Sequence, residues 1–107
     1  MTKKHLLPQF IQKRLPSLDS TQDKSIADLT AQVKYFYPDF GWTWYGVAWD
    51  GEDLMWGLVD GFEKELGYWR MTELMGNRGK LGLEIERDYH FTPTPLSTLL
   101  DAPPLES

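Results

Sequence analysis

The chain has 107 residues, a formal net charge of −5 and no cysteine. A chain of this length predicts one domain with a single modest core. The lack of cysteine excludes disulfides, thiolate metal sites and a cysteine nucleophile, and the negative charge disfavours binding to a nucleic-acid backbone. There is no apolar run long enough to cross a bilayer and no signal-peptide pattern. We therefore expect a cytoplasmic protein of one domain (residues 1–107), with an ordered core over 6–100 and flexible tails at 1–4 and 102–107.

The first part of the chain predicts a short helix followed by a loop. The helix is expected over residues 8–15, because Pro8 suits its first turn and Phe10 and Ile11 begin an apolar stripe. It is too short to be stable alone, so its apolar side chains must dock on another element. The polar stretch 17–28 predicts a connecting loop with one helical turn towards its end.

Alternating apolar residues predict three strands in the middle of the chain, over residues 30–37, 42–49 and 54–61. All five tryptophans lie within residues 42–69. Asp50 and Gly51 supply turn residues for a hairpin between the second and third strands. Strict alternation places Trp44 and Trp49 on opposite faces of the sheet. Because both faces are apolar in places, the sheet is either covered on both sides or exposes aromatic side chains.

The second half of the chain predicts shorter elements. They are a charged connection at 63–65, a strand over 67–71, a helix over 72–75, a loop over 77–83, a strand over 85–91 and a helix from Pro95. Thr72 and Thr94 are expected to cap the two helices. The whole pattern predicts an α+β domain: a twisted antiparallel meander of about five strands, with short helices at the N-terminus, before the last strand and at the C-terminus.

Several sequence runs resemble the bacterial domain-of-unknown-function family numbered 2958. They are LLPQFIQKRLPSLDST, VKYFYPDFGWTWY, GLVDGFEKELGYW and LGLEIERDYHFTPTPLS, and the resemblance covers residues 6–100. The chain departs from the family pattern at Lys80 and Glu84, where proline is common. The resemblance implies no catalytic or binding residue, because the family has none assigned. It implies a genetic context on plasmids, phages and integrative conjugative elements, often beside genes for antirestriction or DNA handling.

Two groups of charged side chains are candidates for chemistry. Glu63 and Glu65 would point the same way from an extended segment, roughly 6 to 7 Å apart, as in a catalytic carboxylate pair. The alternative is an ordinary solvent-facing turn. Glu86, Asp88 and His90 would share one strand face beside Arg87 and could bind a divalent metal or act as acid and base. The alternative is a polar outer face or a lattice of ion pairs, and we assign no catalytic residue, metal ligand or cofactor.

The central hairpin predicts a surface for a protein partner. Tryptophan and tyrosine are favoured interface anchors, and one sheet face beneath short helices cannot bury so many of them. The chain between Asp50 and Glu65 also carries six acids against one lysine, so these acids are either a solvated face or a patch for a basic partner. The expected partner-binding residues are Trp42, Trp44, Tyr45, Trp49, Asp50, Glu52, Asp53, Trp56, Glu63 and Glu65.

The favoured interpretation is a non-enzymatic accessory or interaction protein of a bacterial mobile element. Its partner would be an unidentified host or element protein, and one version is a DNA-mimicking or anti-defence inhibitor. The alternatives are a small-ligand-binding protein or hydrolase-like enzyme that uses a carboxylate pair, and a nucleic-acid-associated regulator. The regulator would need a basic stripe made of Lys34, Arg70, Arg78, Lys80 and Arg87. Neither nucleic acid nor membrane is the expected ligand, and both a monomer and a homodimer fit the sequence.

Overall fold

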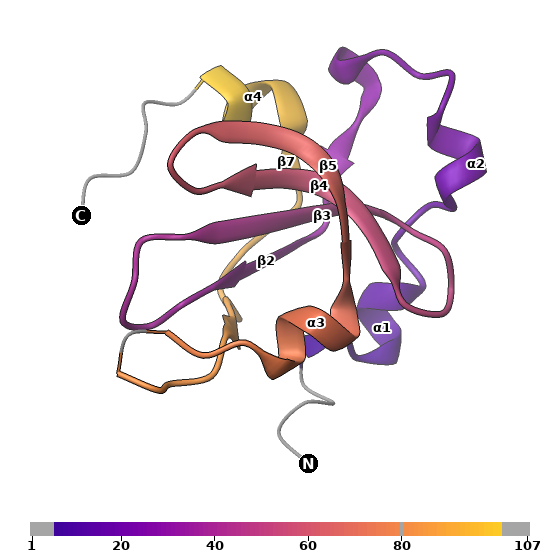
Figure 1. The fold of residues 1–107 in the computed structure, drawn as a ribbon. Coiled ribbons are helices and arrows are strands. Elements are labelled where there is room, and N and C mark those ends of the chain that lie inside the picture. Colours follow the sequence, from indigo (N-terminus) through magenta and orange to yellow (C-terminus); the bar gives the residue numbers. More distant parts are fainter. Residues whose placement is uncertain (1–5, 80, 102–107) are drawn as a thin grey trace.

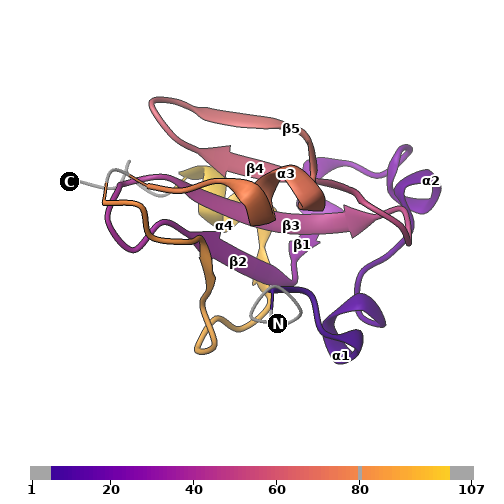
Figure 2. The ribbon, with the colours of Figure 1, turned by 60° about the horizontal axis from the view of Figure 1, so that its bottom comes forward.

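The computed structural model describes residues 6–79 and 81–101. The predicted tails, 1–4 and 102–107, lie outside these described residues. The described chain forms an α+β domain built on a five-stranded antiparallel sheet of order β5-β4-β3-β2-β6, with a separate pair of β1 and β7 (Figure 1). Figure 2 shows α3 in front of the sheet and α4 behind it, so short helices cover both faces.

The strands differ greatly in length. Those of the large sheet are β2 (Val33–Phe36), β3 (Thr43–Trp49), β4 (Leu54–Asp60), β5 (Lys64–Arg70) and β6 (Glu86–Arg87). The small pair is β1 (Thr30–Ala31) with β7 (Thr94–Pro95). The helical elements are α1 (Gln9–Gln12), α2 (Leu18–Thr21), the 3-10 turn η2 (Ile26–Asp28), α3 (Met71–Gly76) and α4 (Leu96–Asp101).

Two predicted strands are wrong in extent. The predicted strand 30–37 divides at Gln32 into β1 and β2, which pair in different sheets. The predicted strand 85–91 is reduced to β6, because the Asp88 carboxylate accepts a hydrogen bond from the His90 backbone N–H at 2.9 Å and the chain turns there. Side chain-to-backbone bonds of this kind compete with strand pairing.

The predicted connection at 63–65 is also wrong, because β5 begins at Lys64. The ammonium group of Lys64 donates to the carbonyl oxygen of Leu99 at 2.7 Å, near the end of α4. Because Lys64 and Leu99 are 35 residues apart, the charged sequence at 63–65 could not indicate this contact. The predicted loop 17–28 contains α2, whose first turn is capped by the hydroxyl of Ser17. The final helix begins at Leu96 rather than Pro95.

A β-bulge in β3 decides which side chains share a face. Gly46 pairs with Gly57 and Ala48 pairs with Trp56, so Val47 is an extra residue in the ladder. The extra residue shifts the alternation by one position. Trp49 therefore joins Trp44 in one core cluster. The prediction that these two tryptophans lie on opposite faces is wrong for this reason.

Both faces of the sheet carry an apolar core, and every residue of β3 is buried. The core of the first face, which includes side chains of α1 and α3, contains Leu6, Leu7, Ile11, Leu15, Val33, Tyr35, Trp44, Trp49, Met55, Trp69, Met71, Leu74 and Ile85. The core of the second face, which includes α4, contains Leu29, Ala31, Tyr45, Val47, Leu58 and Leu96. The two-sided cover expected for an apolar sheet is therefore present over β3.

Tyr35 fastens the N-terminal segment to the centre of the sheet. Its side chain is fully buried, and its hydroxyl donates to the carbonyl oxygen of Leu6 at 2.6 Å. Burial raises the pKa of Tyr35 well above its usual range, while the nearby charge of Arg87 lowers it by a smaller amount. The phenol therefore stays protonated and serves as a donor at any working pH.

We expect Tyr35→Phe to lower the free energy of unfolding by about 1 to 3 kcal/mol, because the Leu6 carbonyl is left buried without its donor. Urea unfolding followed by tryptophan fluorescence measures this. Tyr68→Phe is the matched control, since Tyr68 is 56% exposed and its loss of a hydroxyl should change stability by less than about 0.5 kcal/mol. Equal stability of the two variants would contradict the assigned role of Tyr35.

Candidate functional site

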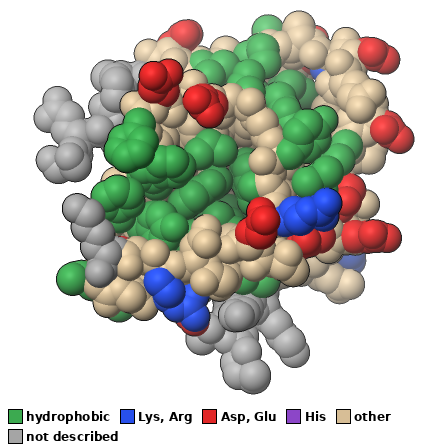
Figure 3. Space-filling view, in the orientation of Figure 1, with side chains coloured by type: hydrophobic (Ala, Val, Ile, Leu, Met, Phe, Trp, Pro, Cys, Tyr) green, Lys and Arg blue, Asp and Glu red, His purple; other side chains and the backbone are tan. Residues whose placement is uncertain are grey.

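The described residues leave the first face of the sheet incompletely covered at one end. Figure 3 shows hydrophobic side chains gathered in a hollow between the β4–β5 hairpin and the segment 77–84. A chain of aromatic contacts runs through this end of the sheet, with ring centroids 5.3 to 6.0 Å apart. We call its five members, Phe40, Tyr37, Trp44, Trp42 and Phe62 in order of contact, the aromatic hollow.

Local backbone features hold these rings in place. Tyr37 and Phe40 belong to the β2–β3 turn, where the Tyr37 N–H donates to the Trp42 carbonyl at 3.3 Å. Trp42 lies directly against Gly61: a Cβ there would come within 2.6 Å of the indole ring. Glycine is therefore needed at position 61 for this close approach. The Asp39 carboxylate accepts from the Leu81 backbone N–H at 2.6 Å and ties the segment 77–84 to the same turn.

The aromatic hollow grades from a buried floor to an exposed rim. Trp44 is 6% exposed, Trp42 is half-buried, and Phe62 is 88% exposed. Phe62 contacts the Trp42 ring edge-to-face at 5.4 Å. Edge-to-face pairs are favourable, but one ring contact does not remove a phenylalanine from water. Folding alone therefore gives no reason for an aromatic residue at this hairpin tip.

Two acids flank the exposed rim. Glu63 follows Phe62 in the hairpin loop, and Glu65 pairs with Val59 across β4 and β5. Val59 packs on the first-face core, so Glu65 belongs to the face that carries the hollow. Both carboxylates are exposed, and within the described part of the chain neither forms an ion pair. An acidic edge therefore borders an aromatic surface.

Two of the other predicted acids, Asp50 and Asp53, hold the fold together at the opposite end of β4. Asp50 Oδ1 accepts from the backbone N–H groups of Glu52, Asp53 and Leu54 at 2.7 to 3.0 Å and closes the β3–β4 loop. The Asp53 carboxylate accepts from the N–H and hydroxyl of Thr72, both at 2.8 Å, at the start of α3. Thr72, predicted as the cap of this helix, thus donates hydrogen bonds to Asp53, an acid that is distant in sequence.

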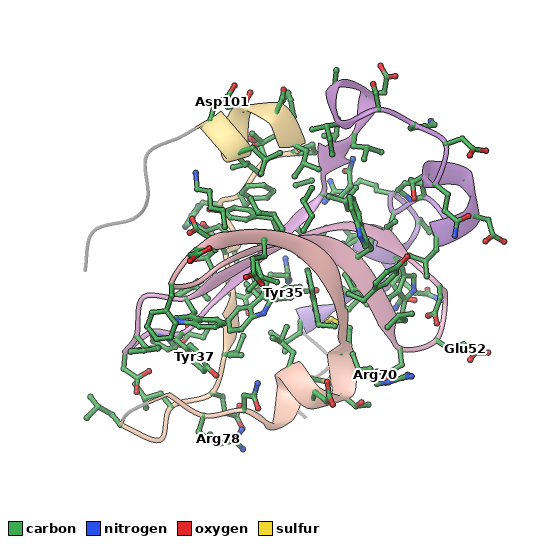
Figure 4. All side chains as sticks on the ribbon, turned by 45° about the horizontal axis from the view of Figure 1, so that its top comes forward. Tyr35, Tyr37, Glu52, Arg70, Arg78 and Asp101 are labelled. Atoms are coloured by element: carbon green, nitrogen blue, oxygen red, sulfur yellow. The ribbon has the colours of Figure 1, made fainter. Side chains whose placement is uncertain are left out.

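The predicted run of acids is therefore divided into two groups. Asp50, Glu52 and Asp53 lie before β4, and Glu63 and Glu65 lie after it, while the sixth acid, Asp60, is buried at the end of β4. Since β4 has seven residues, the groups are about 20 Å apart by strand rise. Figure 4 shows Glu52 at the opposite end of the molecule from Tyr37. One continuous acidic patch, as read from the sequence, is not formed.

The predicted tryptophan surface is also divided. Trp44, Tyr45 and Trp49 are only 6 to 9% exposed, so the expectation that they are surface anchors conflicts with their burial. Trp42 and Trp56 are half-buried, but Trp56 packs against the second-face core. Phe62 was not among the residues predicted from the sequence. The feature that could have indicated it is its position directly after Gly61 in a turn, where an aromatic side chain is rarely covered by a core.

Glu86, Asp88 and His90 do not continue as one strand, because β6 ends at Arg87, but all three line the same open cleft. Asp88 instead pairs with Lys34 at 3.6 Å. Within residues 6–79 and 81–101 no group of three acidic or histidine side chains could hold a metal ion. That cleft has a volume of about 350 Å³.

Ion pairs also occupy much of the predicted basic stripe. Besides Lys34, Arg70 pairs with Asp53 at 3.8 Å and Arg78 with Glu84 at 3.2 Å. Lys80 lies outside the described residues.

With this geometry in hand, comparison with known proteins identifies the family. The family model described as "Protein of unknown function (DUF2958)" matches residues 6–103, nearly the whole chain. The chain belongs to the DUF2958 family. No curated protein and no solved structure matches it. The described helices of this family member include none long and apolar enough to cross a membrane. The family description assigns no activity to its members.

Asp50 gives a pH-dependent test of the structural role of the acids. The bonds from the Glu52, Leu54 and Asp53 backbone lower the pKa of its carboxyl below the ordinary 3.8. A lowered folded-state pKa contributes stability above the ordinary value, and this stability is lost as the pH falls through the lowered pKa. We expect Asp50→Ala to lower the melting temperature most near pH 7 and less at pH 3.

Thermal unfolding by circular dichroism at both pH values measures this difference. Asp50→Asn keeps one acceptor oxygen and should destabilise less than Asp50→Ala at pH 7. Glu52→Ala is the control at the neighbouring exposed acid. A melting-temperature difference for Asp50→Ala that does not change with pH would refute the assignment.

Proposed function

We propose that this DUF2958 member is a non-enzymatic binding protein that engages a protein partner through the aromatic hollow and its acidic edge. The observation that carries the proposal is Phe62, an 88% exposed ring in contact with half-buried Trp42. Aromatic anchors surrounded by partly buried neighbours are typical of binding hot spots. A partner that covered Phe62 would also bury more of Trp42 and the turn beside it.

The charges at the rim indicate the chemistry of the partner. Glu63 and Glu65 are exposed beside the hollow, and the chain has a net charge of −5. Such an edge attracts and orients a basic segment. The proposed partner surface therefore presents an apolar side chain to Phe62 and a lysine or arginine to the two carboxylates. The resemblance to a family carried on mobile elements makes a host or element protein the expected source.

A DNA-mimicking inhibitor is the narrower form of this proposal. Its partner would be a DNA-binding protein, and double-stranded DNA would compete for the same basic surface. The acids that could act as mimics are chiefly Glu63 and Glu65, because Asp50 and Asp53 are already bonded to backbone groups or paired. The proposal therefore rests on a small acidic edge rather than on the whole run of acids.

The geometry gives less support to the two alternatives. A carboxylate-pair enzyme needs two acids that converge in a closed pocket, whereas Glu63 lies in a hairpin loop and both acids are exposed. A nucleic-acid regulator needs a continuous basic stripe, whereas Lys34, Arg70 and Arg78 each face a carboxylate.

The test compares three proteins as baits for affinity capture from a bacterial host lysate, with quantitative mass spectrometry. Phe62→Ser and the double variant Glu63→Lys with Glu65→Lys should each lose a partner that the unchanged chain recovers. For Phe62→Ser we expect at least tenfold weaker affinity for the purified partner, which corresponds to about 1.4 kcal/mol. Isothermal titration calorimetry with that partner measures the loss.

Two control variants distinguish binding at this surface from non-specific binding. Tyr68→Ser removes an exposed aromatic residue, 56% exposed, that lines a pocket with Trp56 on the second face. Glu52→Lys reverses an exposed acid in the distant β3–β4 loop. Both variants should still recover the partner. If the protein is a DNA-mimicking inhibitor, double-stranded DNA should displace the partner from it. Recovery of the same partner by all variants would reject the proposal.

A further inference from the structure

The outer edge of β5 is open, because none of the described elements pairs with it. β5 is the terminal strand of the order β5-β4-β3-β2-β6. Figure 2 shows it on the outside of the sheet, with its neighbour β4 on one side only. The strand at the opposite edge, β6, has two residues, whereas β5 has seven. The edge of β5 is therefore the longer of the two edges that could accept a further strand.

Two hydrogen bonds show which backbone groups of β5 point outward. At one end of the β4–β5 hairpin the Gly61 N–H donates to the Glu63 carbonyl at 3.2 Å. At the other end the Met71 N–H donates to the Asp53 carbonyl at 2.8 Å. Hydrogen-bonded pairs alternate along an antiparallel ladder, so both bonds place the odd-numbered residues of β5 in the pairs bonded to β4. The N–H and C=O groups of the even-numbered residues therefore point away from the sheet.

The edge carries apolar side chains and lacks common features that prevent edge pairing. Proline and β-bulges are two such features. β5 contains no proline, and it pairs with β4 over seven consecutive residues without a bulge. Leu66 is 39% exposed and Tyr68 is 56% exposed, and within the described residues no other element bonds to their outward backbone groups. Such an edge is suited to pairing with another strand.

Gly67, at the centre of β5, has no explanation within the described fold. A Cβ added there would meet nothing within 4 Å, and the φ angle of Gly67 is not positive. By contrast, a Cβ at Gly57 would collide with the carbonyl oxygen of Tyr45. Glycine weakens the interior of a strand and often marks a place where another backbone approaches closely. The position of Gly67 on an open edge indicates such an approach from outside the chain.

The sequence of β5 is complementary to itself about Gly67. When two identical antiparallel strands are related by a two-fold axis, residues at equal distances from the axis oppose each other. With the axis at Gly67, Leu66 of each copy opposes Tyr68 of the other. Both residues have outward backbone groups, so these are hydrogen-bonded pairs with apolar side chains on the same face. Gly67 then faces itself in the closer, non-hydrogen-bonded position, where it brings no side chain.

The charged ends of β5 fit this register, although they limit its strength. Lys64 opposes Arg70, and like charges directly opposite each other weaken a strand pair. Both groups are directed at their own chain, since Lys64 donates to the Leu99 carbonyl at 2.7 Å and Arg70 pairs with Asp53 at 3.8 Å. An axis one residue to either side would leave an outward residue of β5 without a partner in the other β5.

We propose that β5 pairs with β5 of a second copy of this chain, antiparallel and about a two-fold axis at Gly67. The pairing joins the two five-stranded sheets into one continuous sheet. Because a single pair of strands forms a small interface, the dimer is weak and depends on concentration. This proposal is independent of the partner at the aromatic hollow, and it is tested with the purified chain alone.

Sedimentation equilibrium of the full chain should show an apparent mass that rises from one chain towards two as the concentration increases. Hydrogen exchange followed by NMR locates the interface. The N–H groups of Leu66 and Tyr68 should become protected as the dimer forms, whereas those of Glu65 and Gly67 are protected by β4 at every concentration. A chain that stays monomeric at about 1 mM, or a dimer that leaves Leu66 and Tyr68 unprotected, would overturn the proposal.

A lysine at the edge tests the same surface by substitution. Leu66→Lys should weaken dimerisation at least tenfold, because charged side chains on an edge strand oppose pairing. Leu83→Lys is the matched control, since Leu83 is an exposed leucine outside the strands, 46% exposed, and this variant should dimerise like the unchanged chain. Thermal unfolding checks that both variants are folded. Equal dissociation constants for the two variants would place the interface elsewhere.

A charge exchange at Gly67 distinguishes self-pairing from the binding of a different strand. Gly67→Lys and Gly67→Glu both have room within one chain, but each places like charges against each other at the axis. Each variant alone should dimerise at least tenfold more weakly than the unchanged chain. An equimolar mixture should recover the dimer, because lysine then faces glutamate. A mixture that dimerises no better than either variant alone would refute the axis at Gly67.

Discussion

The burial of β3 on both faces is the constraint on which the rest of the structure depends. No residue of this strand reaches solvent to any large extent, so each face needs its own cover of apolar side chains. Short helices supply it: α1 and α3 contribute to the first face, and α4 with η2 packs on the second. The bulge at Val47 determines how the large side chains are divided between the two faces, because it places Trp49 on the same face as Trp44. The tryptophans of the central hairpin are therefore mainly the core of a two-sided sheet.

This arrangement gives the two ends of the β3–β4–β5 meander different roles. At one end, Asp50 closes a loop and Asp53 holds the start of α3, so carboxylates replace missing backbone partners. At the other end, none of the described helices covers the Phe62 turn, and exposed acids stand beside an exposed ring. The first end is satisfied by contacts within the chain. The second end has aromatic surface and charge that the rest of residues 6–79 and 81–101 does not use, which is why the proposed partner is placed there.

Local patterns in the sequence predicted the elements better than the site. Alternation located β3 and β4, and Asp50-Gly51 located their turn, because both signals lie in consecutive residues. The family was recognised from separate runs in the right order, and the match over residues 6–103 confirms it. The surface residues were harder to predict. Counting tryptophans pointed to Trp44 and Trp49, which are buried, and passed over Phe62, since composition does not say which rings a helix will cover.

The sequence by itself determined the fold class, the central hairpin and the family of this protein, because period-two alternation and turn residues act within a few positions of each other. Tertiary structure alone decided three further features. It placed the bulge at Val47, which depends on how two strands pair. It separated the acids of Asp50–Asp53 from Glu63 and Glu65 along the length of β4. It also brought Arg87 to the ring of Phe10, because only the docking of α1 on the sheet joins residues so distant in the chain.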